Sequence, residues 1–240
     1  MEKPAIIKVL EDAHRAHQAG DFVNALKFYE YFFDHALEED PLAYYGARLS
    51  YCLQGWAELA KTFPSAKNAL EKKKREMHDS YFSGDRDPER FHDYLSICRC
   101  LGTESDVLEK FLNLHHSEPK SAAKLIKFLW NDLINAEHWQ VCSELMEQSS
   151  LKLDELFAVF DEATKLKDSD PAFNNPRFEQ HIVDTLLSDT QKVVTVLRHS
   201  GRQDEIPDLQ RQFYIAATQR DHALLSKQAH AKGSFLFTGH

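Results

Sequence analysis

The sequence predicts an all-α protein, an array of about eleven or twelve antiparallel helices. Apolar residues recur at spacings of three and four along nearly the whole chain. Glycine and proline number only eight each, and no glycine occurs between Thr103 and Ser200, where a β-rich domain would need glycines in its turns. The chain of 240 residues is also long enough to bury a core without disulfides or metals.

The first three helices are defined by their ends. A stripe from Ile7 to His17 predicts a first helix that ends at Gly20, a residue suited to a C-terminal cap. A second helix is expected to reach about Glu39, because Pro41 cannot continue it. The third has the most regular apolar stripe and is expected to be one uninterrupted helix, closed by Pro64, through Leu42, Tyr45, Leu49, Cys52, Trp56, Leu59 and Phe63.

The middle of the chain continues this pattern. A fourth helix is expected over residues 65–82, followed by the surface loop "SGDRDP". Asp87 and Pro88 read as N-cap and first position of a helix that ends at Gly102. Thr103 and Asp106 resemble a capping box at the start of the next helix. Residues 122–134 are apolar on nearly all sides and are expected to form the most buried helix, with another helix over about 137–147.

The last third contains two long helices and a tail. A stripe of Leu153, Phe157 and Phe160 predicts a helix ending near Lys167, and "KDSDPAFNNP" is expected to be a connector. The next helix opens at residues 175–176 and ends at Gly201, with Phe178, Ile182, Leu186, Val193 and Leu197 on one stripe. One or two shorter helices should finish by residue 231. The C-terminal tail, residues 233–240, is expected to be either frayed or docked through Phe235 and Phe237.

One segment resembles the tetratricopeptide repeat (TPR). In "QAGDFVNALKFYEYFF", Gly20, Asp21 and Phe22 match the Gly-Asp-Tyr turn of that repeat, Ala25 its small residue at the helix crossing, and Tyr29 and Phe32 its apolar second-helix positions. The stretch "INAEHWQVCSELM" resembles the repeat more weakly, with Trp139 in the place of Phe22, and "HSGRQDEIPDLQ" is a third stretch with a weak resemblance. The stretches "YYGARLSYCLQGWAELAKTFPSAKNAL" and "FHDYLSICRCLG" are similar to bacterial TPR-like proteins of no assigned function.

The resemblance implies a TPR-like right-handed superhelix, formed as a single helical-repeat domain over residues 1–232. It also implies protein binding but names no partner. The residues expected to pack helix against helix in such repeats are Gly20, Phe22, Ala25, Tyr29, Phe32, Trp56 and Trp139.

Composition favours a cytoplasmic protein without a nucleic-acid or membrane partner. The net charge of −9 disfavours binding to a nucleic-acid backbone, and the basic run at Lys72–Arg75 is expected to be a solvated helix face. No apolar run approaches the length of about 20 residues needed to cross a bilayer, and the N-terminus lacks a signal pattern. The four cysteines form no CxxC pair, so no disulfide framework is expected.

Motifs for catalysis or metal binding are weak. The pairs Glu11/His14 and Glu89/His92 have the Glu-x-x-His spacing of helical di-iron proteins, but that spacing is also expected by chance in a chain so rich in both residues. No HExxH, GxSxG, P-loop or dinucleotide fingerprint occurs. We therefore predict no catalytic residues, no metal and no cofactor.

The candidate binding residues are Tyr44, Arg48 and Tyr51, which form with Gly55 a second stripe on the third helix. Aromatic residues beside arginine are typical of protein-binding hot spots. The alternative is that this face packs on the next hairpin, in which case Arg48 must pair with an internal acid. The function expected first is an adaptor that binds a peptide or protein segment in a concave groove; the alternatives are a helical enzyme or ligand-binding protein with a site between helices, or a structural subunit of a homo-oligomer.

Overall fold

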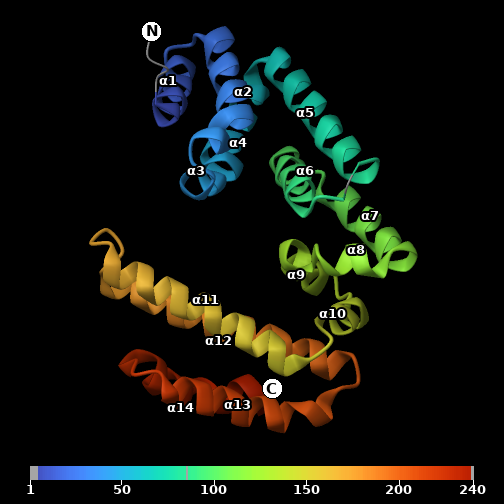
Figure 1. Ribbon diagram of the computed structural model, residues 1–240, viewed down its shortest axis with the longest axis vertical. Coiled ribbons are helices and arrows are strands. Elements are labelled where there is room, and N and C mark those ends of the chain that lie inside the picture. The colour runs from blue at the N-terminus through green and yellow to red at the C-terminus, as the bar shows by residue number, and fades with distance from the viewer. Residues whose placement is uncertain (1–4, 85, 239–240) are drawn as a thin grey trace. The chain divides into compact units, whose positions relative to one another are not determined.

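The computed structural model describes residues 5–84 and 86–238, and within these ranges the protein is helical without any strand (Figure 1). The all-α prediction is therefore confirmed. The described chain forms 13 helices, besides one short 3-10 helix, when α3, η1 and α4, which follow one another without a break, are taken as one. None of the helices in this part of the chain combines the length and apolar composition of a bilayer-spanning segment.

The chain divides into two compact units, residues 1–128 and 129–240. The prediction of one repeat domain over residues 1–232 depends on how these units are arranged, and it stays a prediction. The first unit contains α1 (Ile6–Gln18), α2 (Phe22–Glu39), α3 (Pro41–Ala47), η1 (Arg48–Cys52), α4 (Leu53–Thr62), α5 (Pro64–Phe82), α6 (Pro88–Leu101), α7 (Glu104–Ser117), α8 (Pro119–Ala123) and the start of α9 (Ile126–Asn135).

Helices α1 and α2 form a hairpin around the predicted turn. Gly20 has a φ of +77°, a left-handed conformation that glycine adopts without a steric penalty. The Asp21 carboxylate then accepts a hydrogen bond from the backbone N–H of Asn24 and caps α2. Ala25, Tyr29 and Phe32 are completely buried, whereas Phe22 is half-buried and packs edge-on against a histidine of α1.

The predicted third helix contains a π-helical segment. Residues 41–62 are continuously helical, but η1 forms a wider, π-type turn between α3 and α4. Cys52 at the end of η1 and Leu53, Trp56 and Leu59 of α4 are completely buried, and the indole N–H of Trp56 donates to the carbonyl of Ala66 on α5 at 3.0 Å. The side chain of Leu42 lies outside the described residues.

The predicted helix over residues 122–134 is wrong as a single element. It is divided at Lys124 and Leu125 into α8 and α9, and turn-type hydrogen bonds run from the Leu125 N–H to Ala122 and from the Phe128 N–H to Leu125. Gly102, with a φ of +68°, ends α6 as expected. The predicted capping box at Thr103 does not form, because the threonine side chain makes no capping bond to the first turn of α7.

The second unit is built around two long helices. Its elements after α9 are α10 (Trp139–Met146), α11 (Ser149–Ser169), α12 (Pro176–His199), the short 3-10 helix η2 (Gln203–Glu205), α13 (Ile206–Gln219) and α14 (Ala223–Thr238). Trp139 is half-buried and stacks on His199 of α12 with ring centroids 4.8 Å apart. Arg220 pairs through two nitrogens with the Asp161 carboxylate of α11, at 2.7 and 2.8 Å, which fixes α13 to α11.

Helix α14 continues past residue 233, where the tail was expected to begin. Leu236 and Phe237 are buried, and the Phe237 ring lies 5.8 Å from that of Phe213 on α13. Arg198 of α12 donates to the Phe237 carbonyl at 2.7 Å. Phe237 therefore docks as one of the two alternatives predicted, while the side chain of Phe235 lies outside the described residues.

Candidate functional site

The π-helical segment η1 separates the predicted binding residues. Arg48 is only 3% exposed, Tyr44 is half-buried against Phe32, and Tyr51 is 66% exposed. A uniform α-helix would place Arg48 and Tyr51 on one face, but the wider turn between them changes the direction of the side chains that follow. The three residues therefore do not form one surface.

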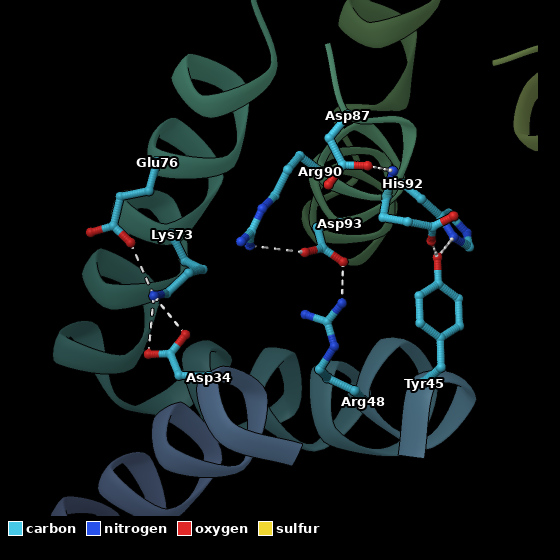
Figure 2. Close-up of polar contacts among 10 residues, drawn as sticks. Asp34, Tyr45, Arg48, Lys73, Glu76, Asp87, Arg90, His92 and Asp93 are labelled. Carbon is cyan, nitrogen blue, oxygen red and sulfur yellow. Dashed lines mark hydrogen bonds and ion pairs between the residues drawn. The ribbon is translucent and has the colours of Figure 1, made fainter. Parts of the chain in front are cut away.

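Arg48 forms a buried ion pair with Asp93 of α6, in which the two side chains are 4% and 3% exposed (Figure 2). The guanidinium also lies over the Phe33 ring of α2, 4.5 Å from its centroid, in a cation–π contact. Arg90 approaches the same carboxylate at 4.0 Å. Arg48 is thus paired with an internal acid, which was the alternative to a position in a binding groove. Its charge is not exposed to a partner.

A second polar cluster joins α3 to α6 beside this pair. The Tyr45 hydroxyl donates to the Glu89 carboxylate and lies 2.7 Å from Nδ1 of His92 (Figure 2). The His92 ring stacks on Phe128 with centroids 4.2 Å apart. Burial lowers the pKa of His92 to about 4, so the ring is neutral at physiological pH. Burial, reinforced by the bond to Glu89, raises the pKa of the Tyr45 hydroxyl.

The Glu-x-x-His spacing therefore places both Glu89 and His92 against the Tyr45 hydroxyl. Within residues 5–84 and 86–238, no three histidine, cysteine, aspartate or glutamate side chains are grouped closely enough to hold a metal ion. The basic run on α5 is partly engaged as well, because Lys73 contacts Asp34 of α2 at 2.9 Å and Glu76 at 3.0 Å (Figure 2). Lys72 is 73% exposed, as expected for a solvated face.

Tyr51 and Gly55 line a pocket of about 270 Å³ between α1 and α4, together with His14 and His17. Tyr29 forms part of its wall, and a Cβ atom on Gly55 would lie only 2.5 Å from the Tyr29 hydroxyl oxygen. Glycine is thus required here by the close approach of a buried tyrosine. The pocket shares residues with the predicted stripe but is not a long groove.

A longer apolar surface lies on the second unit, along α11. Leu156, Val159, Ala163 and Leu166 follow one another at spacings of three, four and three, and Val159 is 64% and Leu166 42% exposed. Leu156, Val159 and Ala163 of the stripe line a pocket of about 270 Å³ between α11 and α12, to which α12 contributes Phe178, His181, Ile182, Thr185, Leu186 and Asp189. A neighbouring depression includes Ala158, Glu162 and Leu166. We call this surface the α11–α12 groove.

The groove was missed in the sequence, although a signal for it exists. The stripe Leu153, Phe157 and Phe160 was assigned as the apolar face of this helix, and these three residues are indeed buried. The second stripe of α11 is displaced from the first around the helix. A helix with apolar residues on two faces buries one of them in its own fold and presents the other.

The carboxylates of the groove are not accompanied by a lysine or arginine in its described lining. Of the described residues that line it, Asp189 and Glu162 are acids, His181 is a histidine, and none is a lysine or arginine. Each acid pairs with a lysine three residues along its own helix, at 2.7 and 2.6 Å. The Glu162–Lys165 pair is exposed, where such pairs contribute little to stability, whereas the side chains of Asp189 and Lys192 are only 29% and 30% exposed.

Comparisons of this chain with protein-family models, with curated proteins and with solved structures found no match. What the structure shows of this protein is an all-helical chain, in the described residues, with an open apolar groove on α11 and α12.

Proposed function

We propose that this protein is a binding module that takes an amphipathic helix of a partner protein in the α11–α12 groove. The observation that carries the proposal is the apolar stripe on α11 beside an apolar pocket, in which Val159 and Leu166 are exposed and Leu156 and Ala163 are half-buried. From Leu156 to Leu166 the stripe covers ten residues of helix, a rise of about 15 Å, which matches about three turns of a docked helix. Recognition by side chains at i, i+3, i+4 and i+7 suits such a surface.

The chemistry of the groove favours a partner helix with basic flanks. The apolar floor would bury the apolar face of that helix, at about 25 cal/mol for each Å² removed from water. Asp189 and Glu162 lie among the lining residues and would attract lysine or arginine beside that face. An enzyme site would favour several convergent ionisable groups, whereas the pocket between α11 and α12 offers His181 and Asp189 among its lining residues.

We also propose that the helix pairs stack in a TPR-like right-handed superhelix, and that the protein acts as an adaptor in the cytoplasm. Support for the repeat comes from the α1–α2 hairpin, where Gly20 forms the turn and the small, fully buried Ala25 leaves room for close packing.

The test uses synthetic peptides, because the proposal specifies the apolar face and the basic flanks of the partner helix but not the partner protein. Fluorescence anisotropy would compare a labelled 14-residue peptide with a leucine face and lysine flanks, the same peptide with glutamate flanks, and a scrambled lysine peptide. We expect the lysine-flanked helix to bind most tightly. The double variant Val159→Ser/Leu166→Ser should lose affinity by about tenfold or more, because each serine removes part of the apolar contact.

A matched control removes exposed apolar side chains elsewhere. Val23 on α2 and Ile215 on α13 are 54% and 50% exposed, so the double variant Val23→Ser/Ile215→Ser changes the overall hydrophobicity similarly. It should bind the peptide like the unmodified protein. Equal binding of the scrambled peptide, or equal losses in the two double variants, would show that the attraction is non-specific and contradict the proposal.

A further inference from the structure

A third pocket lies in the first unit, between α5 and α7, and its volume is about 330 Å³. It is lined by His78 and Phe82 of α5, by Arg86 of the following loop, and by Lys110, Asn113, Leu114, Ser117 and Glu118. The volume is at the lower end of the range of about 300–1,000 Å³ that is typical of small-molecule sites. No sequence motif indicated this pocket.

Its charge is opposite to that of the chain as a whole. The protein carries a net charge of −9, yet the described lining of the pocket has the cations Arg86 and Lys110 against the single acid Glu118, while the His78 ring lies 2.9 Å from the carboxylate of Asp79. Glu118 is already engaged, since it accepts from Arg86 at 2.7 Å and from the Ser121 hydroxyl at 3.0 Å. Lys110 is half-buried, and no acid of the described residues lies within ion-pair distance of it. Among the described residues that line the pocket, the charge of Lys110 is therefore uncompensated.

Arg86 is held in an unusual backbone conformation at the edge of this pocket. Its φ is +61°, in the left-handed region that few non-glycine residues adopt. The side chain is fixed by the bond to Glu118, by a bond to the Tyr81 carbonyl at 3.4 Å, and by its position 5.6 Å above the centroid of the Phe82 ring. Conformations of this kind persist only where surrounding contacts hold them, and they are enriched at binding sites.

The remaining lining groups provide a wall and hydrogen-bonding partners. Phe82 and Leu114 form the apolar part, and the Asn113 amide provides both a donor and an acceptor. A cation cluster beside an aromatic ring suits a molecule that has an anionic end and a planar or apolar body. We propose that the α5–α7 pocket binds a small aromatic or apolar molecule carrying an oxyanion, either a phosphate ester or a carboxylate. This proposal is independent of the α11–α12 groove.

The experiment is a titration of the full chain with phenyl phosphate, benzoate and benzyl alcohol at constant ionic strength, followed by NMR and calorimetry. These probes share an aromatic ring and differ in the anionic group. We expect saturable binding of phenyl phosphate or benzoate, and the tighter of the two identifies the oxyanion. Benzyl alcohol should bind at least about tenfold more weakly, because it lacks the charge that Lys110 and Arg86 would contact.

Two lysine variants make the test specific. Lys110→Gln removes the unpaired charge of the pocket but keeps most of the side chain, and it should weaken binding of the anionic probe at least about tenfold. Lys120→Gln removes an exposed charge on α8 and should leave binding unchanged. The proposal is overturned if neither anion binds saturably, if benzyl alcohol binds as well as the anions, or if both variants weaken binding equally.

Discussion

Arg48 of η1 and Asp93 of α6 form an ion pair that is almost completely removed from solvent. The two residues are 45 positions apart in sequence, and their contact joins the π-helical segment to the helix that packs beside it. A buried charge without its partner costs far more than the pair contributes. The pair therefore controls the stability of the first unit in a way that can be measured.

We expect Arg48→Ala to lower the free energy of unfolding by about 3–5 kcal/mol, because the buried Asp93 carboxylate would lose its close partner and keep only Arg90, which lies 4.0 Å away. Asp93→Leu alone should be similarly costly, since it leaves the guanidinium unpaired. The double variant Arg48→Met/Asp93→Leu should recover most of the loss, because two apolar side chains need no partner. Urea denaturation of all four proteins measures these values. An Arg48→Ala protein as stable as the parent would contradict the buried pair.

At Gly55 we expect a change in stability opposite to the one that helix propensity predicts. Replacing a mid-helix glycine by alanine ordinarily stabilises a helix by about 1 kcal/mol. In Gly55→Ala the new methyl group would lie 2.5 Å from the Tyr29 hydroxyl oxygen, so we expect destabilisation. Gly46→Ala is the matched control on α3, because nothing lies within 4 Å of its added Cβ, and it should be stabilising. The measurement is the melting temperature of each variant. If both melting temperatures shift in the same direction, the contact between Gly55 and Tyr29 is not as tight as described.

His92 should make the protein less stable in mild acid. Its pKa falls from 6.5 to about 4 on folding, so between these values the unfolded chain binds a proton that the folded chain does not. The stabilisation is complete above about pH 6.5 and is lost as the pH falls through 4. At about 1.4 kcal/mol for each pKa unit, the upper bound of the effect is about 3.5 kcal/mol, and solvent screening of the partly exposed ring reduces it.

Urea denaturation at pH 7 and pH 5 tests this dependence. The variant His92→Asn should show a smaller loss of stability between the two pH values than the parent protein. His116→Asn, which changes an exposed histidine on α7, should lose as much as the parent. An unchanged pH dependence in His92→Asn would mean that this ring does not titrate as the buried site requires.

Much of the helix layout could be predicted from local signals. Gly20, Gly102 and Gly201 were expected at helix ends, and all three have positive φ angles. Asp87 and Pro88 were expected as N-cap and first helical residue, and the Asp87 carboxylate does accept from the N–H of Glu89. These features depend on a few neighbouring residues, so the sequence alone contains the information.

The features that were missed depend on distant parts of the chain. The π-helical segment places Arg48 against Asp93, and nothing within residues 41–62 indicates that partner. The division between α8 and α9 lies at Lys124 and Leu125, where neither glycine nor proline marks a break. The groove on α11 was missed because the stripe of Leu153, Phe157 and Phe160 was taken as the complete apolar face of the helix.

The α11–α12 groove is tested most directly by methyl NMR of the full chain during titration with the lysine-flanked amphipathic peptide. If the groove binds the helix, the methyl signals of Val159, Leu166 and Ile182 should shift progressively and saturate together. The methyl signals of Val23 and Ile215, which are exposed on other helices, should stay in place. Saturation of the peptide signal without shifts at the groove, or shifts of equal size at all five residues, would contradict the account.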